Sequence, residues 1–259
     1  MDIPIYQVDA FASRPFEGNP AAVCPLKQWL PDDLMQSIAA ENNLSETAFF
    51  APDGANYAIR WFTPMAEVDL CGHATLASAW VLFNRLGFRS DTVRFSSRSG
   101  MLTVARDGDL LILDFPCQAP RPCATPPGLA EALGAQPTEC LENVDLVAVF
   151  DEAQAVQDLR PRMERLSTLD YRGIIVTAPG GGYDFVSRFF GPSVGVPEDP
   201  VTGSAHTKLA PYWAARLGKE RLRARQVSAR GGDLDCRVKG DRVLIAGRAA
   251  PFLEGMLSL

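Results

Sequence analysis

The sequence predicts an α+β protein of two similar halves, each a barrel-like, mostly antiparallel sheet around a central helix. A stretch at residues 60–87 is repeated at residues 187–218, with seven identities at a constant offset of 131 positions, among them Gly72 and Gly203. Short β-forming runs separated by tight turns accompany both copies. A repeat at half the chain length indicates two related domains. We expect them at 1–117 and 118–259, with the tail near 248–259 as a candidate strand of the first half.

A proline-rich stretch separates the halves, since residues 116–127 contain five prolines. Proline removes a backbone donor and resists both helix and central strand. Before this stretch, strands are expected at 92–97, 101–106 and 110–115. After it, they are expected at 146–150, 173–177, 183–190, from 227 onward, and at 234–238 and 242–246. A helix is expected at 32–42, opened by Pro31 and closed by Asn42 and Asn43.

Each repeated segment ends in a helix, expected at 71–86 and 202–217. In the first, apolar residues cover most of the helix circumference, which is typical of a buried helix. Gly87 and Gly218 follow the two helices, in the position where glycine commonly ends a helix.

Composition excludes several classes of function. The net charge of −6 argues against a nucleic-acid-binding protein. The N-terminus has neither a cationic region nor a long apolar run, so no signal peptide, membrane span or membrane partner is expected. The six cysteines form no CxxC pair, and we expect reduced thiols in a cytoplasmic protein.

The starts of the two repeated helices are candidate anion sites. The first turn of a helix has free N–H groups and a partial positive charge, which suit a carboxylate. Gly72 and Gly203 would let a ligand approach the backbone closely. If the halves are related by a pseudo-twofold, the two starts should face each other across a cleft. Two capped helices packed at a domain interface are the alternative.

The side chains at these starts favour a functional site. The only two histidines of the chain, His73 and His206, lie in the repeated segments, and Asp199 and Ser204 flank the second helix start. Each histidine taken singly is more often a structural donor. Their joint placement in the repeated segments is harder to explain by structure alone.

Glu46 is the candidate proton carrier. It lies in the stretch NLSETAFF, where Glu46, Ala48 and Phe50 share one face of the expected strand. An apolar face disfavours the charged carboxylate and raises its pKa, so that such a group can exchange protons near neutral pH. An exposed glutamate at a strand start is the alternative. Cys71 and His73 have metal-ligand spacing, but the sequence offers no full ligand set, and we expect no metal.

Five motifs in order give the chain a family resemblance. They are VDAFASRPFEGNPAAV, NLSETAFF, RWFTPMAEVDLCGHATLA, EDPVTGSAH and QVSARGGDL. The chain resembles the phenazine-biosynthesis PhzF-type isomerases, which share a fold with diaminopimelate epimerase. The resemblance implies two halves with the active site between them, a homodimer, and no organic or metal cofactor.

The resemblance also implies roles for individual residues. Glu46 matches the acid–base glutamate that moves a proton between substrate carbons. His73, Asp199 and Ser204 match residues that bind and assist the substrate, and Ser45 matches a neighbouring contact. The founding substrate is trans-2,3-dihydro-3-hydroxyanthranilate. Many members have no known phenazine role, so the resemblance implies a cofactor-independent isomerase of a small carboxylic acid more firmly than it implies a substrate.

Two other functions are open. Two-base epimerases of this fold use opposed cysteines at the helix starts, but Thr202 aligns with Cys71 in the repeat, and a hydroxyl is too weak an acid for that task. A non-catalytic protein that binds a small acid is the second alternative. Glu46 disfavours it, because anion binding alone does not require a carboxylate beside the anion.

Overall fold

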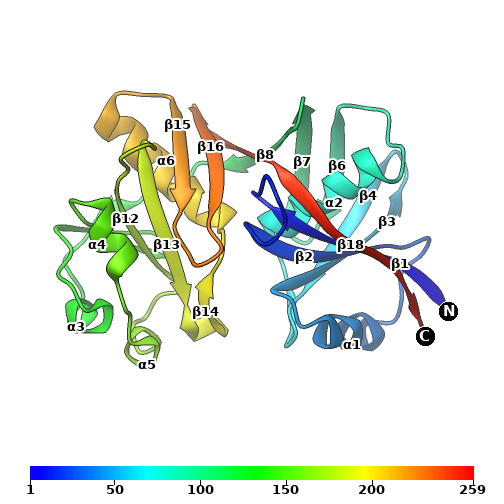
Figure 1. Ribbon diagram of the computed structural model, residues 1–259, viewed down its shortest axis with the longest axis horizontal. Helices are drawn as coiled ribbons and strands as arrows, with labels where there is room; N and C mark the ends of the chain where they lie inside the picture. The colour runs from blue at the N-terminus through cyan, green and yellow to red at the C-terminus, as the bar shows by residue number, and fades with distance from the viewer. The chain divides into compact units, whose positions relative to one another are not determined.

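A computed structural model describes residues 1–259 and confirms the α+β class. The chain divides into two compact units, which are drawn in Figure 1. The first comprises Met1–Asp114 and Ala246–Leu259, and the second comprises Phe115–Ile245. None of the helices combines the length and apolar character needed to cross a membrane.

The first unit contains two helices among its strands. Its elements are β1 (Asp2–Ala10), β2 (Asn19–Pro25), α1 (Asp32–Asn42), β3 (Glu46–Asp53), β4 (Asn56–Phe62), β5 (Glu67–Val68), α2 (Gly72–Asn84), β6 (Thr92–Ser97), β7 (Gly100–Asp107), β8 (Leu110–Pro116) and β18 (Ala249–Ser258). β18 runs antiparallel to β1, with Ala10 opposite Ala249 and Asp2 opposite Ser258. The C-terminal tail is therefore an integral strand of this unit.

The second unit contains the remaining elements. They are β9 (Arg121–Pro122), α3 (Leu129–Leu133), β10 (Glu139–Glu142), β11 (Leu146–Val149), α4 (Ala153–Asp158), α5 (Met163–Leu166), β12 (Ile174–Pro179), β13 (Phe185–Gly191), η1 (Pro192–Val194), β14 (Val196–Asp199), α6 (Gly203–Leu217), β15 (Arg221–Gln226), β16 (Gly232–Lys239) and β17 (Arg242–Gly247). Two strands cross the boundary, since β8 ends at Pro116, inside the second unit, and the last strand of the second unit ends at Gly247, inside the first.

The two units pair their strands in the same order. In the first, β2 is parallel to β3, β3 antiparallel to β4, β4 parallel to β6, and β6 antiparallel to β7. In the second, β11 is parallel to β12, β12 antiparallel to β13, β13 parallel to β15, and β15 antiparallel to β16. In each unit the repeated helix follows the third strand of this series. The matching order is what a repeat of 131 residues would produce.

Helix α2 is buried, as its apolar composition predicted. Ten of its thirteen residues are buried. It packs against β1, β2 and β3 (Figure 1). The helix ends at Asn84, two residues before the predicted end, and Gly87 takes part in its C-terminal capping turn. Gly87 has a φ of +67°, and the N–H of Phe88 bonds back to the carbonyl of Leu82 at 3.0 Å.

The strand predicted from residue 227 onward is wrong. The strand there is β15, which ends at Gln226, one residue before the predicted start. Leu222, Ala224 and Gln226 are buried, whereas the arginines between them point outward or are partly covered. The arginines of β15 mark the outer face of the sheet.

Candidate functional site

Both repeated helices begin without a side-chain cap. The N-cap residues Cys71 and Thr202 have extended backbones, with φ of −142° and −114°, and neither side chain bonds to the helix start. Neither first turn contains an acidic residue. Cys71 and Thr202 are only 6% and 8% exposed. Buried N–H groups without a capping side chain are suited to bind an anion.

Glu46 lies beside His73 in the first unit. The distance between Oε2 of Glu46 and Nε2 of His73 is 3.1 Å, and their side chains are 16% and 7% exposed. The two atoms are within ion-pair distance without being aligned as a hydrogen bond. A carboxylate and an imidazole at this distance can share and exchange a proton.

Strand β3 places Glu46 on the α2 side of the sheet. Phe49 and Ala51 belong to the core that α1 covers. Because side chains alternate along a strand, Glu46 and Ala48 point to the opposite face. Ser45 precedes the strand and is half-buried. Gly72, also half-buried, is the first residue of α2.

Cys71 contacts the other nitrogen of His73. Its Sγ lies 3.5 Å from Nδ1. Burial, followed by the charge of Glu46, raises the pKa of the Cys71 thiol to about 11. Burial also lowers the pKa of His73, but the charges of Cys71 and Glu46 more than offset it, so the net shift is upward.

Asp199 and Thr202 shape the helix start of the second unit. Asp199 ends β14, and the Thr202 hydroxyl donates to its Oδ2. The buried Gln226 holds this segment from β15, accepting from the N–H of Thr202 at 2.8 Å and donating to the carbonyl of Asp199 at 2.7 Å. Gly203 is the first residue of α6 and is buried.

Ser204 lies beside a cluster with more positive than negative charges. Nη2 of Arg172 donates to Oγ of Ser204 at 3.3 Å. Arg172 also donates to both oxygens of the fully buried Asp145, at 2.8 and 2.6 Å. Nζ of Lys208, only 1% exposed, lies 3.1 Å from Asp145 and donates to the carbonyl of Ser204. One carboxylate between two cations leaves net positive charge at the start of α6.

His206 is a structural residue rather than a proton carrier near neutral pH. It is fully buried, Nδ1 lies 2.8 Å from the carbonyl of Thr202, and its ring lies 5.8 Å from that of Phe185. Burial lowers its pKa to about 4, although the Thr202 carbonyl opposes this shift.

Within each unit the structure brings the predicted residues together. Glu46 and His73 meet in the first unit, and Asp199, Gly203 and Ser204 lie along the short segment that opens α6 in the second. Sequence reasoning missed Gln226 and the cluster of Asp145, Arg172 and Lys208. Gln226 opens the quoted motif QVSARGGDL, which was the one available signal. Lys208 follows Ser204 by one helical turn, but a lysine in a helix is normally expected at the surface.

Comparison with known proteins gives consistent matches. The PhzC-PhzF model, described as phenazine biosynthesis-like protein, matches residues 8–255. An uncharacterized isomerase of Pseudomonas aeruginosa is 58% identical over 259 residues, and the match covers all of both chains. The crystal structure of a PhzF-family phenazine biosynthesis protein from Enterococcus faecalis is 49% identical, with a TM-score of 0.99 over all of both chains. The fold alone is shared with a hydroxyproline epimerase from Agrobacterium vitis (12% identity, TM-score 0.63, covering 100% of this chain and 93% of that one).

Proposed function

We propose that this chain moves a proton between two carbons of a small carboxylic acid. The chain belongs to the PhzC-PhzF family of phenazine biosynthesis-like proteins and is an isomerase. The reaction needs no organic or metal cofactor. The observation that carries the proposal is the 3.1 Å approach of Glu46 to His73 at the uncapped start of α2.

Glu46 serves as both base and acid. Its carboxylate takes a proton from one substrate carbon, and the electron pair of the broken C–H bond delocalises into the conjugated system of the substrate. The carboxylic acid, whose O–H proton exchanges with solvent, then gives a proton to a second carbon, and the enzyme regains its starting state. His73 stabilises the Glu46 carboxylate before the first step and after the second, because its Nε2 lies next to Oε2 of Glu46.

The helix starts bind the acid. We assign to the N–H groups at Gly72 and Gly203 the binding of negative charge, whether of the substrate carboxylate or of the charge that develops during proton transfer. Ser45, Asp199 and Ser204 are the side chains that we expect to contact the substrate. Arg172 supports this assignment, since its guanidinium donates to Ser204 and adds positive charge there.

A proton shift is favoured over a two-base racemisation. Racemisation needs a base on each face of one carbon. Burial and Glu46 raise the pKa of Cys71 to about 11, so its thiolate is scarce near neutral pH. The Thr202 hydroxyl, which aligns with Cys71 in the repeat, donates to Asp199. Neither group is suited to act as the second base.

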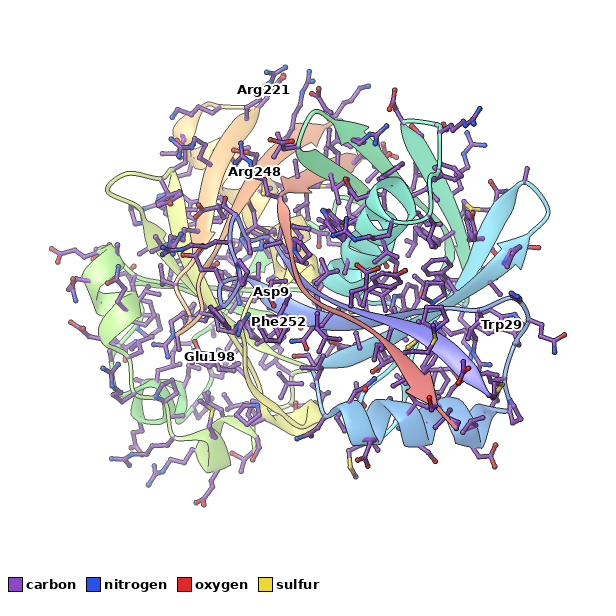
Figure 2. All side chains as sticks on the ribbon, turned by 45° about the vertical axis from the view of Figure 1, so that its right-hand side comes forward. Asp9, Trp29, Glu198, Arg221, Arg248 and Phe252 are labelled. Carbon is purple, nitrogen blue, oxygen red and sulfur yellow. The ribbon has the colours of Figure 1, made fainter.

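We also expect the protein to form a homodimer. Four exposed apolar residues, called here the C-terminal patch, lie on β18 and on the connection between β1 and β2: Phe16, Phe252, Leu253 and Met256. The rings of Phe16 and Phe252 lie 5.5 Å apart, and Phe252 is labelled in Figure 2. An apolar edge of this kind is suited to bind a second chain. Sedimentation velocity of the protein and of Met256→Lys tests this, and a wild-type monomer would contradict it.

The reaction is tested by isotope exchange. EDTA-treated protein is incubated in D2O with a panel of small cyclic acids, and each acid is recovered for NMR and mass spectrometry. We expect deuterium at carbon for at least one acid, together with a migrated double bond. Binding without any exchange across the panel would instead favour a protein that only binds small acids.

A further inference from the structure

Three side chains of different chemistry converge between β3 and α2. Glu46, Cys71 and His73 offer a carboxylate oxygen, a thiol sulfur and an imidazole nitrogen, all within 4.8 Å of one another. The pair Cys71-x-His73 has ligand spacing, but the sequence alone does not show which residue would complete the set. The fold supplies it, because the start of β3 brings Glu46 to the start of α2. We call these three residues the β3–α2 cluster.

Two atoms of the β3–α2 cluster lack hydrogen-bond partners. Oε2 of Glu46 and Nε2 of His73 are both buried, and neither makes an aligned hydrogen bond, although they lie 3.1 Å apart. Buried polar atoms are normally satisfied. A single cation would satisfy both atoms, because oxygen and nitrogen ligands with zinc bonds of about 2.0–2.2 Å lie roughly 3.4 Å apart in a tetrahedral site.

The third donor selects the metal. Sγ of Cys71 lies 3.5 Å from Nδ1 of His73, so the Cys71 side chain must turn to a different rotamer to reach a metal bound at Nε2. Mixed nitrogen, sulfur and oxygen donors suit Zn²⁺, whereas Mg²⁺ and Ca²⁺ prefer oxygen ligands. Three protein ligands also leave a fourth tetrahedral position open.

We propose that the β3–α2 cluster binds one Zn²⁺ through Glu46, Cys71 and His73, and that zinc thereby inhibits the isomerase. Binding forms a bond from the metal to each donor and releases the Cys71 thiol proton to solvent. Glu46 is then a metal ligand and cannot take a proton from carbon. The binding stands on the geometry of the cluster, whereas the inhibition rests on the proposed function.

Calorimetric titration of EDTA-treated, full-length protein with ZnCl₂ tests the site. We expect one equivalent to bind. Cys71→Ala should weaken binding by about tenfold or more, because even indirect partners of a metal are worth 10–100-fold in affinity. Cys117→Ser, which changes a half-buried thiol of the second unit, should bind zinc like the wild type. Cys71→Ser is the second variant, since serine is favoured at an N-cap and should preserve α2.

Cobalt gives a spectroscopic reading of the same site. Co²⁺ added to the wild type should produce a thiolate-to-metal charge-transfer band in the near ultraviolet, and Cys71→Ala should lack it. Absence of zinc binding, or equal affinity and an equal cobalt band in Cys71→Ala, would overturn the proposal. If zinc binds as expected but leaves turnover intact, the zinc site stands and the assigned role of Glu46 fails.

Discussion

Arg188 and Glu198 are joined by two parallel N–H···O bonds, of 2.8 and 3.0 Å, in the second unit. Arg60 and Glu67 make the same pair in the first unit, with both bonds at 2.7 Å. These are the arginine and the acid that open each repeated segment. A bidentate pair fixes the distance and orientation of the strands that carry it. The same arginine–glutamate ion pair is therefore present at the corresponding point of both units.

The two arginines differ in what their loss should cost. Arg188 also donates to the carbonyls of Val156 and Leu159, at 3.1 and 3.0 Å, and its side chain is 10% exposed. We predict that Arg188→Met lowers the free energy of unfolding by about 3–5 kcal/mol, because it leaves a partly buried carboxylate and two carbonyls without a donor. Urea denaturation followed by circular dichroism measures this loss.

Arg60→Met is the matched control. Glu67 keeps a second partner, since Nη2 of Arg98 lies 2.7 Å from its Oε2. The loss in free energy of unfolding should therefore be smaller than for Arg188→Met. An equal or larger loss for Arg60→Met would contradict this reading of the two pairs.

Gln226 is predicted to stabilise the segment that opens α6. Gln226→Ala removes the acceptor of the Thr202 N–H and the donor to the Asp199 carbonyl. Leaving buried polar groups unsatisfied costs about 1–3 kcal/mol each, so the free energy of unfolding should fall by at least that amount. Ser228→Ala is the milder control, because the two bonds that it removes, to the carbonyl of Pro200 and from the N–H of Gly231, are only partly buried. Equal stability of Gln226→Ala and wild type would show that this network does not hold the segment.

The sequence correctly predicted elements whose ends are marked by residues within the element or next to it. The helix at 32–42 has the predicted bounds, because Pro31 and Asn43 mark its two ends and Asn43 adopts a left-handed φ of 49°. The strand at 92–97 also has its predicted bounds, since tight turns delimit it. The burial of α2 followed from its apolar circumference.

Contacts between distant segments could not be predicted in this way. The parallel pairing of β2 with β3 and of β11 with β12 depends on which strands meet in space. The buried Lys208 exists only because Asp145, 63 positions earlier in the chain, supplies its charge partner. The approach of Glu46 to Cys71 and His73 is of the same kind, and composition around each residue does not reveal it.

His206 is predicted to make the fold sensitive to acid. Burial lowers its pKa in the folded state to about 4, below its ordinary value of 6.5. As pH falls, His206 is protonated in the unfolded chain before it is protonated in the folded protein. The contribution of His206 to the free energy of unfolding is therefore complete above pH 6.5 and is lost as pH falls toward 4, by about 1.4 kcal/mol per pH unit. His206→Asn should lose this slope, as measured by urea denaturation at a series of pH values.

His73 provides a control of opposite sign. Its folded pKa is raised, so its contribution is complete below pH 6.5 and is lost as pH rises through the folded pKa. His73→Asn should therefore change the stability profile on the alkaline side and leave the acid slope in place. Identical acid slopes in wild type and His206→Asn would exclude the assignment to His206.

The start of α6 is predicted to bind a carboxylate without metal. A benzoate titration of EDTA-treated protein, followed by calorimetry, should show binding that benzamide, its uncharged analogue, does not reproduce. Gly203→Val should weaken the binding of benzoate, because a branched side chain at the first residue of the buried helix start blocks close approach to its N–H groups. Binding that requires metal, or that Gly203→Val leaves unchanged, would argue against this site.

The most direct test of the proposed chemistry is the rate of deuterium incorporation by Glu46→Gln. Glutamine keeps the shape of Glu46 beside His73 but cannot carry a proton to and from carbon. With an acid that the wild type isomerises, we predict that exchange falls by about 10²–10⁴-fold or more, whereas the affinity for that acid changes little. Near-wild-type exchange in Glu46→Gln would contradict the proposed mechanism.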